Sequence, residues 1–147
     1  MEAAAAGAGR ANFQERPFAI ARPIWEEMVR HCNEEKPNEA CGLLSGRNGR
    51  AETIWRMENT EKSPDAFAMD TRQIQKVLQK ISLKGEALVG IYHSHPTAPP
   101  IPSTADIAYA YYPEAAYLIL SLSSNQPELC CYRILGKQAF VLPFQLI

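Results

Sequence analysis

The sequence predicts a single α+β domain in which a mixed sheet is flanked by about three helices in an α/β/α-like arrangement. Two patterns carry this prediction: segments with apolar residues at helical spacing, and segments with apolar residues in runs or in alternation. The length of 147 residues suits one domain with one core. With 46% hydrophobic and 21% charged residues, the composition excludes a disordered or collagen-like chain.

The N-terminal half is predicted to contain a short strand, a helix and a hairpin. The strand covers 18–20, and the helix runs from about residue 23 to the Pro37-Asn38 pair. Its apolar face has i, i+3, i+4, i+7 spacing and consists of Trp25, Met28, Val29 and Cys32. A buried strand over 39–46 is expected to turn at Asn48-Gly49 into a strand over 51–57, because Asn-Gly favours a tight hairpin turn.

A second helix and a central strand are predicted next. A polar stretch precedes a short extended segment over 66–69, and the helix runs from about 71 to 83. Its core-facing stripe consists of Ile74, Val77, Leu78 and Ile81. A central strand over 87–92 leads directly into His93-Ser94-His95-Pro96, and the proline-rich loop over 97–102 is expected to be stiff.

The last predicted elements are a third helix and three closing strands. The helix starts at Ser103, with one face formed by Ile107, Ala110 and Tyr111. The strands cover 116–122, 128–135 and 138–146. The first 16 residues are rich in Ala and Gly and are expected to form a flexible tail, so the folded domain is expected over 17–147.

Charge and cysteine content exclude several classes of function. The formal net charge is −1, which offers no electrostatic footprint for nonspecific nucleic-acid binding. No run of 18 or more apolar residues suggests a membrane span, and no export signal is recognisable. We therefore expect a cytoplasmic protein with four reduced cysteines. Because no Cys-x-x-Cys pair occurs, a cysteine-only zinc site is not expected.

Residues that can carry chemistry gather after the central strand. His93 and His95 are two positions apart in an extended segment, so both imidazoles point to the same side. Asp106 lies just past the stiff loop, near the first turn of the third helix, and can return to the same point. Two imidazoles and one carboxylate suit a catalytic zinc, which leaves a fourth position for water. Hydrolysis of an amide also needs a proton shuttle, usually a carboxylate.

Each part of this pattern also has a structural interpretation. His-x-His is often only a polar strand end, and Ser103-x-x-Asp106 fits a capping box at the start of a helix. The whole pattern, His-x-His-x7-Ser-x2-Asp, arises by chance in on the order of one such chain in several thousand. The third histidine, His31, is expected near the end of the first helix, where a partly charged imidazole interacts favourably with the helix dipole.

The whole pattern resembles the motif of the JAMM (MPN+) family of zinc metalloproteases: His93-x-His95-x7-Ser103-x2-Asp106, preceded by Glu39 in PNEACGLLSG. The resemblance covers nearly the whole chain from about residue 18 onward and is greatest to short prokaryotic stand-alone members. It implies the JAB/MPN fold, a cytidine-deaminase-like domain with a curved, mostly antiparallel sheet. It also implies one zinc ion on His93, His95 and Asp106, Glu39 as the general base, and Ser103 as a donor to the oxyanion.

The resemblance further implies a substrate class. Similar members hydrolyse the amide bond after the C-terminal Gly-Gly of a ubiquitin-like or sulfur-carrier protein, which would be the partner. The leaving group stays open between cysteine, a short extension and a target lysine, and a homodimer is possible. We expect the segment over 66–69 to offer a strand edge on which the Gly-Gly tail lies. Neither nucleic acid nor a membrane is expected as a partner.

Three other classes of protein share part of this fold or motif. A non-catalytic interaction module of the MPN− type keeps the fold and loses the metal, but all five motif residues are intact here. A RadC-like domain shares the spacing, yet that group usually has Asn between the histidines and Ser-Gly after the proline, where this chain has HSHPTAP. A zinc deaminase ranks lower still, because its Pro-Cys-x-x-Cys half is missing.

Overall fold

The computed structural model describes residues 16–147, so the predicted tail over 1–16 lies outside the described residues apart from Arg16. The helices are α1 (Arg22–Glu35), α2 (Thr71–Leu83) and α3 (Thr104–Ala108). The strands are β1 (Phe18–Ile20), β2 (Cys41–Arg47), β3 (Arg50–Met57), β4 (Ala87–His95), β5 (Ala116–Ser121), β6 (Glu128–Leu135), β7 (Gln138–Leu142) and β8 (Phe144–Leu146). None of the helices in this part of the chain is long and apolar enough to cross a membrane.

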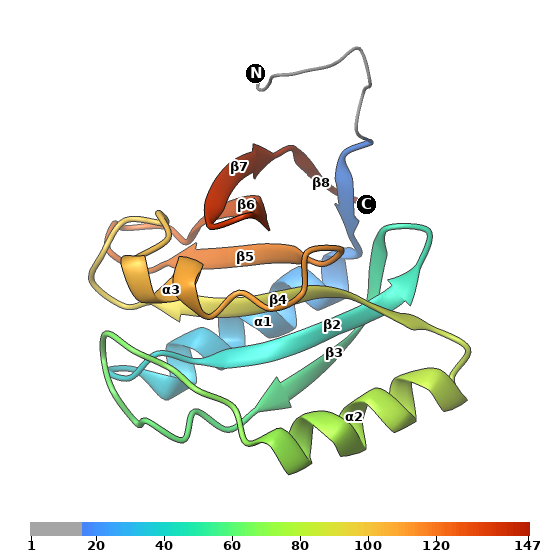
Figure 1. The fold of residues 1–147 in the computed structure, drawn as a ribbon. Helices are drawn as coiled ribbons and strands as arrows, with labels where there is room; N and C mark the ends of the chain where they lie inside the picture. The colour runs from blue at the N-terminus through green and yellow to red at the C-terminus, as the bar shows by residue number, and fades with distance from the viewer. Residues whose placement is uncertain (1–15) are drawn as a thin grey trace.

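All eight strands form one sheet in the order β7-β6-β5-β4-β2-β3-β1-β8, which confirms the predicted α+β class (Figure 1). Four of the seven neighbouring pairs are antiparallel, and three are parallel. The parallel step from β4 to β5 needs a crossover, which is made by the proline-rich loop and α3. This crossover brings α3 back over the end of the central strand β4.

The sheet is rolled, because its two edge strands meet. β7 and β8 stand at opposite ends of the strand order, yet only Pro143 separates them in the chain. Figure 1 shows β7, β8 and β1 close together. The single closing strand predicted over 138–146 was therefore wrong: Pro143 has no N–H for a ladder, and its carbonyl accepts a hydrogen bond from the Phe18 amide instead (2.8 Å).

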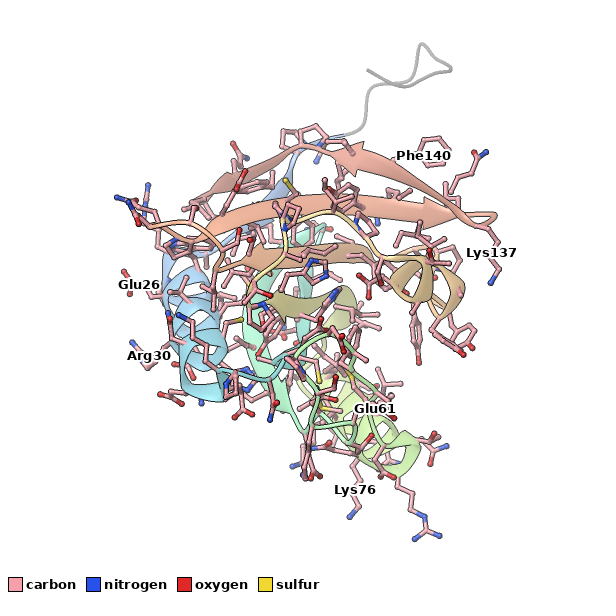
Figure 2. All side chains as sticks on the ribbon, turned by 90° about the vertical axis from the view of Figure 1, so that its left-hand side faces the viewer. Glu26, Arg30, Glu61, Lys76, Lys137 and Phe140 are labelled. Carbon is pink, nitrogen blue, oxygen red and sulfur yellow. The ribbon has the colours of Figure 1, made fainter. Side chains whose placement is uncertain are left out.

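Two hydrophobic cores lie on the two faces of the sheet. Successive residues of the central strands alternate between them, so Leu44 and Tyr92 pack with α1, and Leu43 and Ile91 pack with α2. The helices therefore cover both faces, as the α/β/α-like prediction required. On the solvent side, Glu26 and Arg30 extend from α1 away from the sheet, whereas Phe140 of β7 and Lys76 of α2 lie toward opposite ends of the molecule (Figure 2).

Most predicted elements are confirmed, with small shifts at their ends. The hairpin turns at Asn48 and Gly49, whose φ values of 56° and 72° are those of a type I′ turn. The predicted strand over 39–46 begins two residues later, so Glu39 precedes β2.

The third helix is shorter than its apolar pattern suggested. It ends at Ala108, so Tyr111, which was predicted to share one helix face with Ile107 and Ala110, lies beyond the helix and is 68% exposed. Its continuation is lost because the Tyr112 amide donates to the Tyr117 hydroxyl (2.9 Å) instead of to a helical carbonyl. Ile107 and Ala110 still pack against the core that contains α2.

Candidate metal and catalytic site

The two histidines of β4 point to the α2 side of the sheet. Because Ile91 packs with α2, the period of two along a strand places His93 and His95 on the same face. β4 is hydrogen-bonded on both sides, to β2 and β5, so the two imidazoles are held by a rigid part of the sheet. Both side chains are buried.

Asp106 reaches the same point through the first turn of α3. Ser103 is the N-cap residue: its Oγ accepts from the Asp106 amide (3.0 Å), and Oδ2 of Asp106 accepts from the Ser103 amide (2.9 Å). The same Oδ2 lies 3.1 Å from Nε2 of His93 and 3.2 Å from Nε2 of His95. The capping box and the histidine cluster are therefore not alternatives, because the cap orients the carboxylate toward the histidines.

The three donor atoms fit a metal ion. The two Nε2 atoms are 3.2 Å apart, which matches their distances to the carboxylate oxygen. Ligands of a tetrahedral ion with bonds of about 2.0–2.1 Å lie about 3.3 Å from one another. Within residues 16–147, this is the one group of three His, Cys, Asp or Glu side chains close enough to share an ion.

Neighbouring groups fix the orientation of each imidazole. Nδ1 of His95 donates to the Pro99 carbonyl (2.8 Å), which leaves the lone pair of Nε2 directed at the cluster. The proline-rich loop is itself anchored, because the Tyr132 hydroxyl donates to the Pro100 carbonyl (2.6 Å). On the other side, the ring of Phe67 stacks on His93 with centroids 4.5 Å apart.

The pKa shifts differ among the three donors, and those of His93 and Asp106 favour the protonation states that bind a metal. Burial lowers the pKa of His93 more than the Asp106 carboxylate raises it, so this imidazole is held neutral. Burial also lowers the pKa of His95, but the hydrogen bonds with Asp106 and Pro99 outweigh this and raise it overall. For Asp106, burial raises the pKa, yet the hydrogen bonds with both histidines outweigh it and hold the pKa well below its usual range.

Glu39 is a buried carboxylate with an oxygen that no hydrogen bond from residues 16–147 satisfies. Its side chain is only 4% exposed, and Oε1 is buried without a hydrogen-bond partner in the described part of the chain. Burial raises the pKa of Glu39 to about 8, although His95 lowers it; Asp106 and Asp65 add smaller increases. Glu39 lines a cleft of about 130 Å³ together with Pro64, Asp65, His95, Pro96, Thr97, Ala98 and Ser103. A buried carboxylate with a near-neutral pKa can both accept and return a proton.

The backbone around Glu39 is held by three residues that sequence reasoning missed: Asn59, Ser63 and Ser94. The amide of Asn59 donates to the Glu39 carbonyl (2.9 Å), while the Glu39 amide donates to the Ser63 carbonyl (2.8 Å). On the strand side, Oγ of Ser94 accepts from the Ala40 amide (2.8 Å). The position of Ser94 between the two histidines could have indicated a role in the site. Asn59 is one polar residue in a polar stretch, and nothing in the sequence marks it.

Asn59 also organises the loop that borders the cleft. Its Oδ1 accepts from the amides of Glu61 (3.0 Å) and Ala68 (3.2 Å), and its Nδ2 also donates to the Ala66 carbonyl (3.0 Å). The segment over 66–69 belongs to no strand of the sheet. It is therefore a loop fastened to Asn59, with Phe67 against His93.

His31 does not lie where the helix-dipole interpretation placed it. It is buried on the sheet side of α1, and its Nδ1 is 2.6 Å from the Tyr92 hydroxyl. Burial is the main cause that lowers its pKa. The expectation of a partly charged imidazole was wrong, because position 31 continues the buried i, i+4, i+7 face that begins with Ile24 and Met28.

The chain is similar in sequence to a known family and to several named proteins. Residues 21–135 match the family described as prokaryotic homologues of the JAB domain. A CysO-cysteine peptidase of Mycobacterium tuberculosis is 37% identical over 88% of this chain and 91% of its own. A probable TtuB-protein conjugate cleaving protease of Thermus thermophilus is 32% identical over 84% of this chain and 75% of its own. A desampylase of Haloferax volcanii is 32% identical over 71% and 80%.

Solved structures have the same fold. A protein from Desulfitobacterium hafniense, studied in solution, superposes with a TM-score of 0.80 at 32% identity, over 88% of this chain and 92% of that one. A JAB1/MPN domain protein from Archaeoglobus fulgidus superposes with a TM-score of 0.63 at 16% identity, over 88% and 98%. The rolled mixed sheet with three helices is thus a known architecture.

Proposed function

The chain belongs to the prokaryotic JAB-domain family of JAMM (MPN+) hydrolases, and from this premise we propose that it is a zinc metallopeptidase or isopeptidase. Its substrate is the amide bond after the C-terminal Gly-Gly of a ubiquitin-like or sulfur-carrier protein. The similar proteins are named for cleaving CysO-cysteine and TtuB-protein conjugates, which supports this substrate class. The observation that carries the proposal is the buried, unpartnered Glu39 carboxylate beside a three-residue donor set.

His93, His95 and Asp106 are the residues that hold the metal in this proposal. Zinc, when bound there, would supply a Lewis acid that polarises the scissile carbonyl and lowers the pKa of water to near neutrality. The low pKa of Asp106 and the neutral state of His93 leave both groups in the protonation states that bind a cation. The Pro99 carbonyl fixes the tautomer of His95 that presents Nε2.

Glu39 and Ser103 act on the substrate. Glu39 takes a proton from water while the water oxygen bonds to the carbonyl carbon, and it returns that proton to the nitrogen as the C–N bond breaks. The Ser103 hydroxyl donates a hydrogen bond to the carbonyl oxygen as negative charge develops there. Its Oγ already accepts from the Asp106 amide, so its own proton is available for this second bond. Asn59 and Ser94 both bind the peptide group that joins Glu39 to Ala40, and the Ser63 carbonyl holds the Glu39 amide on the other side.

The Gly-Gly tail is proposed to run along the segment over 66–69, next to the ring of Phe67. Ala66 and Ala68 direct their hydrogen bonds inward to Asn59, which leaves the backbone of Phe67 between them to face the tail. Phe67→Pro removes that N–H, so KM for a carrier substrate is expected to rise without loss of zinc. Unchanged cleavage by this variant would contradict this placement of the Gly-Gly tail.

The proposal is tested with purified protein and carrier fusions extended beyond Gly-Gly. The zinc-loaded chain is expected to release the extension, and a zinc chelator is expected to stop it. Glu39→Gln should keep roughly one zinc per chain and lower kcat at least about 100-fold, whereas His95→Ala should lose the metal. Glu61→Gln is the matched control, because it neutralises an exposed carboxylate on the adjoining loop.

Cleavage that survives both chelation and Glu39→Gln rejects the mechanism. A wild-type chain that binds no zinc favours the alternative, a non-catalytic MPN-type interaction module.

A further inference from the structure

We infer that the cleft beside Glu39 selects against a leaving group that carries a carboxylate, and that Asp65 is the residue that determines this specificity. The favoured substrates are then conjugates in which the nitrogen leaves with a neutral or cationic group, such as the side chain of a target lysine. A free amino acid released from the carrier is disfavoured. This inference rests on the proposed function and narrows its substrate class.

The position of the leaving group follows from the proton shuttle. The nitrogen that receives a proton from Glu39 must come within hydrogen-bond distance of that carboxylate. Glu39 is more than nine-tenths buried and has an unpartnered oxygen, and it lines the cleft. The first atoms beyond the leaving nitrogen therefore lie in the cleft, between Glu39 and the other residues that line it.

The charge of the cleft wall is one-sided. Among residues 16–147, the eight that line the cleft include two carboxylates, Glu39 and Asp65, and no Lys or Arg. Asp65 is not one of the metal-ligating residues, so a bound cation does not take up its charge by coordination. An α-carboxylate is only two bonds from its amino nitrogen, which places it against these carboxylates. Among the lining residues the one basic side chain is His95, and its Nε2 belongs to the metal donor set.

Asp65 is held in this place by its loop. The Ser63 carbonyl accepts a hydrogen bond from the Glu39 amide (2.8 Å), and the Ser63 hydroxyl donates to Oδ1 of Asp65 (2.8 Å). The Asp65 amide in turn donates to Oγ of Ser63 (3.2 Å). Lys62, the neighbouring cation on the loop, pairs with Glu58 (3.0 Å). The loop thus ties the carboxylate of Asp65 to the backbone of the shuttle residue.

The test uses three fluorescent peptides that end in Gly-Gly. The first is joined to cysteine with a free carboxylate, the second to cysteine amide, and the third to the ε-amine of an Nα-acetyl-lysine amide. The first two differ only in the carboxylate. The zinc-loaded wild type is expected to cleave the cysteine amide at least about threefold faster in kcat/KM than the free acid, with a smaller ratio at high salt.

Variants of the loop assign this ratio to Asp65. Asp65→Asn should bring the amide-to-acid ratio close to one, and Asp65→Lys should reverse it. Glu61→Gln is the matched control: it removes a carboxylate from the same loop without touching the cleft wall, and it should retain the wild-type ratio (Figure 2). The same peptides are also titrated onto the zinc-loaded Glu39→Gln variant, with and without Asp65→Asn, and binding is followed by fluorescence anisotropy.

The outcomes separate the inference from the proposed function. Equal kcat/KM for the acid and the amide overturns the role of Asp65, and so does a ratio that Asp65→Asn leaves unchanged. In both cases, cleavage of the peptides still supports the proposed peptidase function. If no peptide is cleaved, a preference for the amide in binding that Asp65→Asn removes supports the inference, and the proposed function fails. Absence of both cleavage and a binding preference overturns both.

Discussion

At the scale of single residues, Glu39 is the side chain whose environment departs most from that of its type. A buried carboxylate without a hydrogen-bond partner is costly in a folded protein and is seen where chemistry requires it. Asp106 is also partly buried, but its Oδ2 has three partners: two imidazoles and the Ser103 amide at the start of α3. The two carboxylates are thereby separated into a ligand with a low pKa and a shuttle with a high one.

This separation predicts the pH dependence of stability in the metal-free protein. The pKa of Glu39 rises from 4.5 to about 8 on folding, so between these values the folded state keeps a proton that the unfolded state has lost. The free energy of unfolding should therefore fall as pH rises from about 5 to 8, by roughly 2–4 kcal/mol from this residue. Urea unfolding with a chelator present measures it.

Glu39→Gln is expected to remove that contribution. The variant should match the wild type near pH 5 and be more stable near pH 8, where the wild type carries a buried charge. A difference between the two proteins that stays constant from pH 5 to 8 would show that burial does not raise this pKa.

Asn59 is the second residue with a prediction of its own. Its amide group makes four hydrogen bonds that join Glu39 to the loop beside the cleft. Asn59→Ala should lower the free energy of unfolding by roughly 2–3 kcal/mol, and it should lower kcat at least about tenfold because the shuttle is no longer held in place. Zinc content should not change, since the four hydrogen bonds of Asn59 go to Glu39, Glu61, Ala66 and Ala68 and not to the metal donor set.

Thr60→Ala is the matched control for Asn59. It removes one side-chain hydrogen bond of the same loop, to the Ala68 carbonyl (3.2 Å), and leaves Glu39 untouched. Its effect on stability should stay below about 1 kcal/mol with kcat unchanged. If Asn59→Ala and Thr60→Ala lower kcat equally, Asn59 has no special part in positioning Glu39.

At the scale of elements, the central pair β2 and β4 decides the geometry of the site. Gly42 lies opposite Tyr92 in this pair, and the Tyr92 ring covers the place that a Cβ of Gly42 would occupy. Tyr92 in turn contacts His31 of α1 through its hydroxyl. The residue that follows Tyr92 is His93, so packing at Gly42 supports the strand that carries the metal ligands.

Gly42→Ala is therefore expected to be strongly destabilising. The new methyl group overlaps the Tyr92 ring in a core position, and the free energy of unfolding should fall by at least about 2 kcal/mol. Urea unfolding measures it, and Leu83→Ala serves as the reference because Leu83 is 88% exposed and should change stability by less than about 0.5 kcal/mol. Wild-type stability in Gly42→Ala would mean that the ring moves aside at no cost.

At the scale of the whole molecule, the rolled sheet with a core on each face keeps most of the cysteines away from solvent. Three of the four cysteines are buried, and Cys130 is partly exposed. Burial raises the pKa of Cys32 and of Cys41 to about 12, so their thiolates are scarce at neutral pH. Neither is close enough to the donor set to join it.

The thiols should report on the integrity of this fold. At pH 7.5 the native protein is expected to react rapidly with a thiol reagent at no more than one site, Cys130, and at all four after unfolding in urea. Cys130→Ala should abolish the rapid reaction. Rapid modification of two or more thiols in the native protein would contradict the burial of Cys32 in α1, Cys41 in β2 and Cys131 in β6.

Much of the fold could be predicted from the sequence, because local patterns carry it. α2 was predicted with its observed ends, and the Asn48-Gly49 turn placed the hairpin. The shorter third helix and the break at Pro143 were missed, because they depend on partners outside the element itself: the Tyr117 hydroxyl of β5 in one case and Phe18 of β1 in the other.

The sequence by itself determined the set of chemical groups, since the spacing of the two histidines, Ser103 and Asp106 follows from the geometry of a strand and of a helix cap. Only the tertiary structure decided what surrounds them. Burial of Glu39, its hold by Asn59 and the acidic wall that Asp65 adds to the cleft all come from loops that meet after the sheet has formed. Desolvation and charge depend on neighbours in space, and a local sequence pattern does not record them.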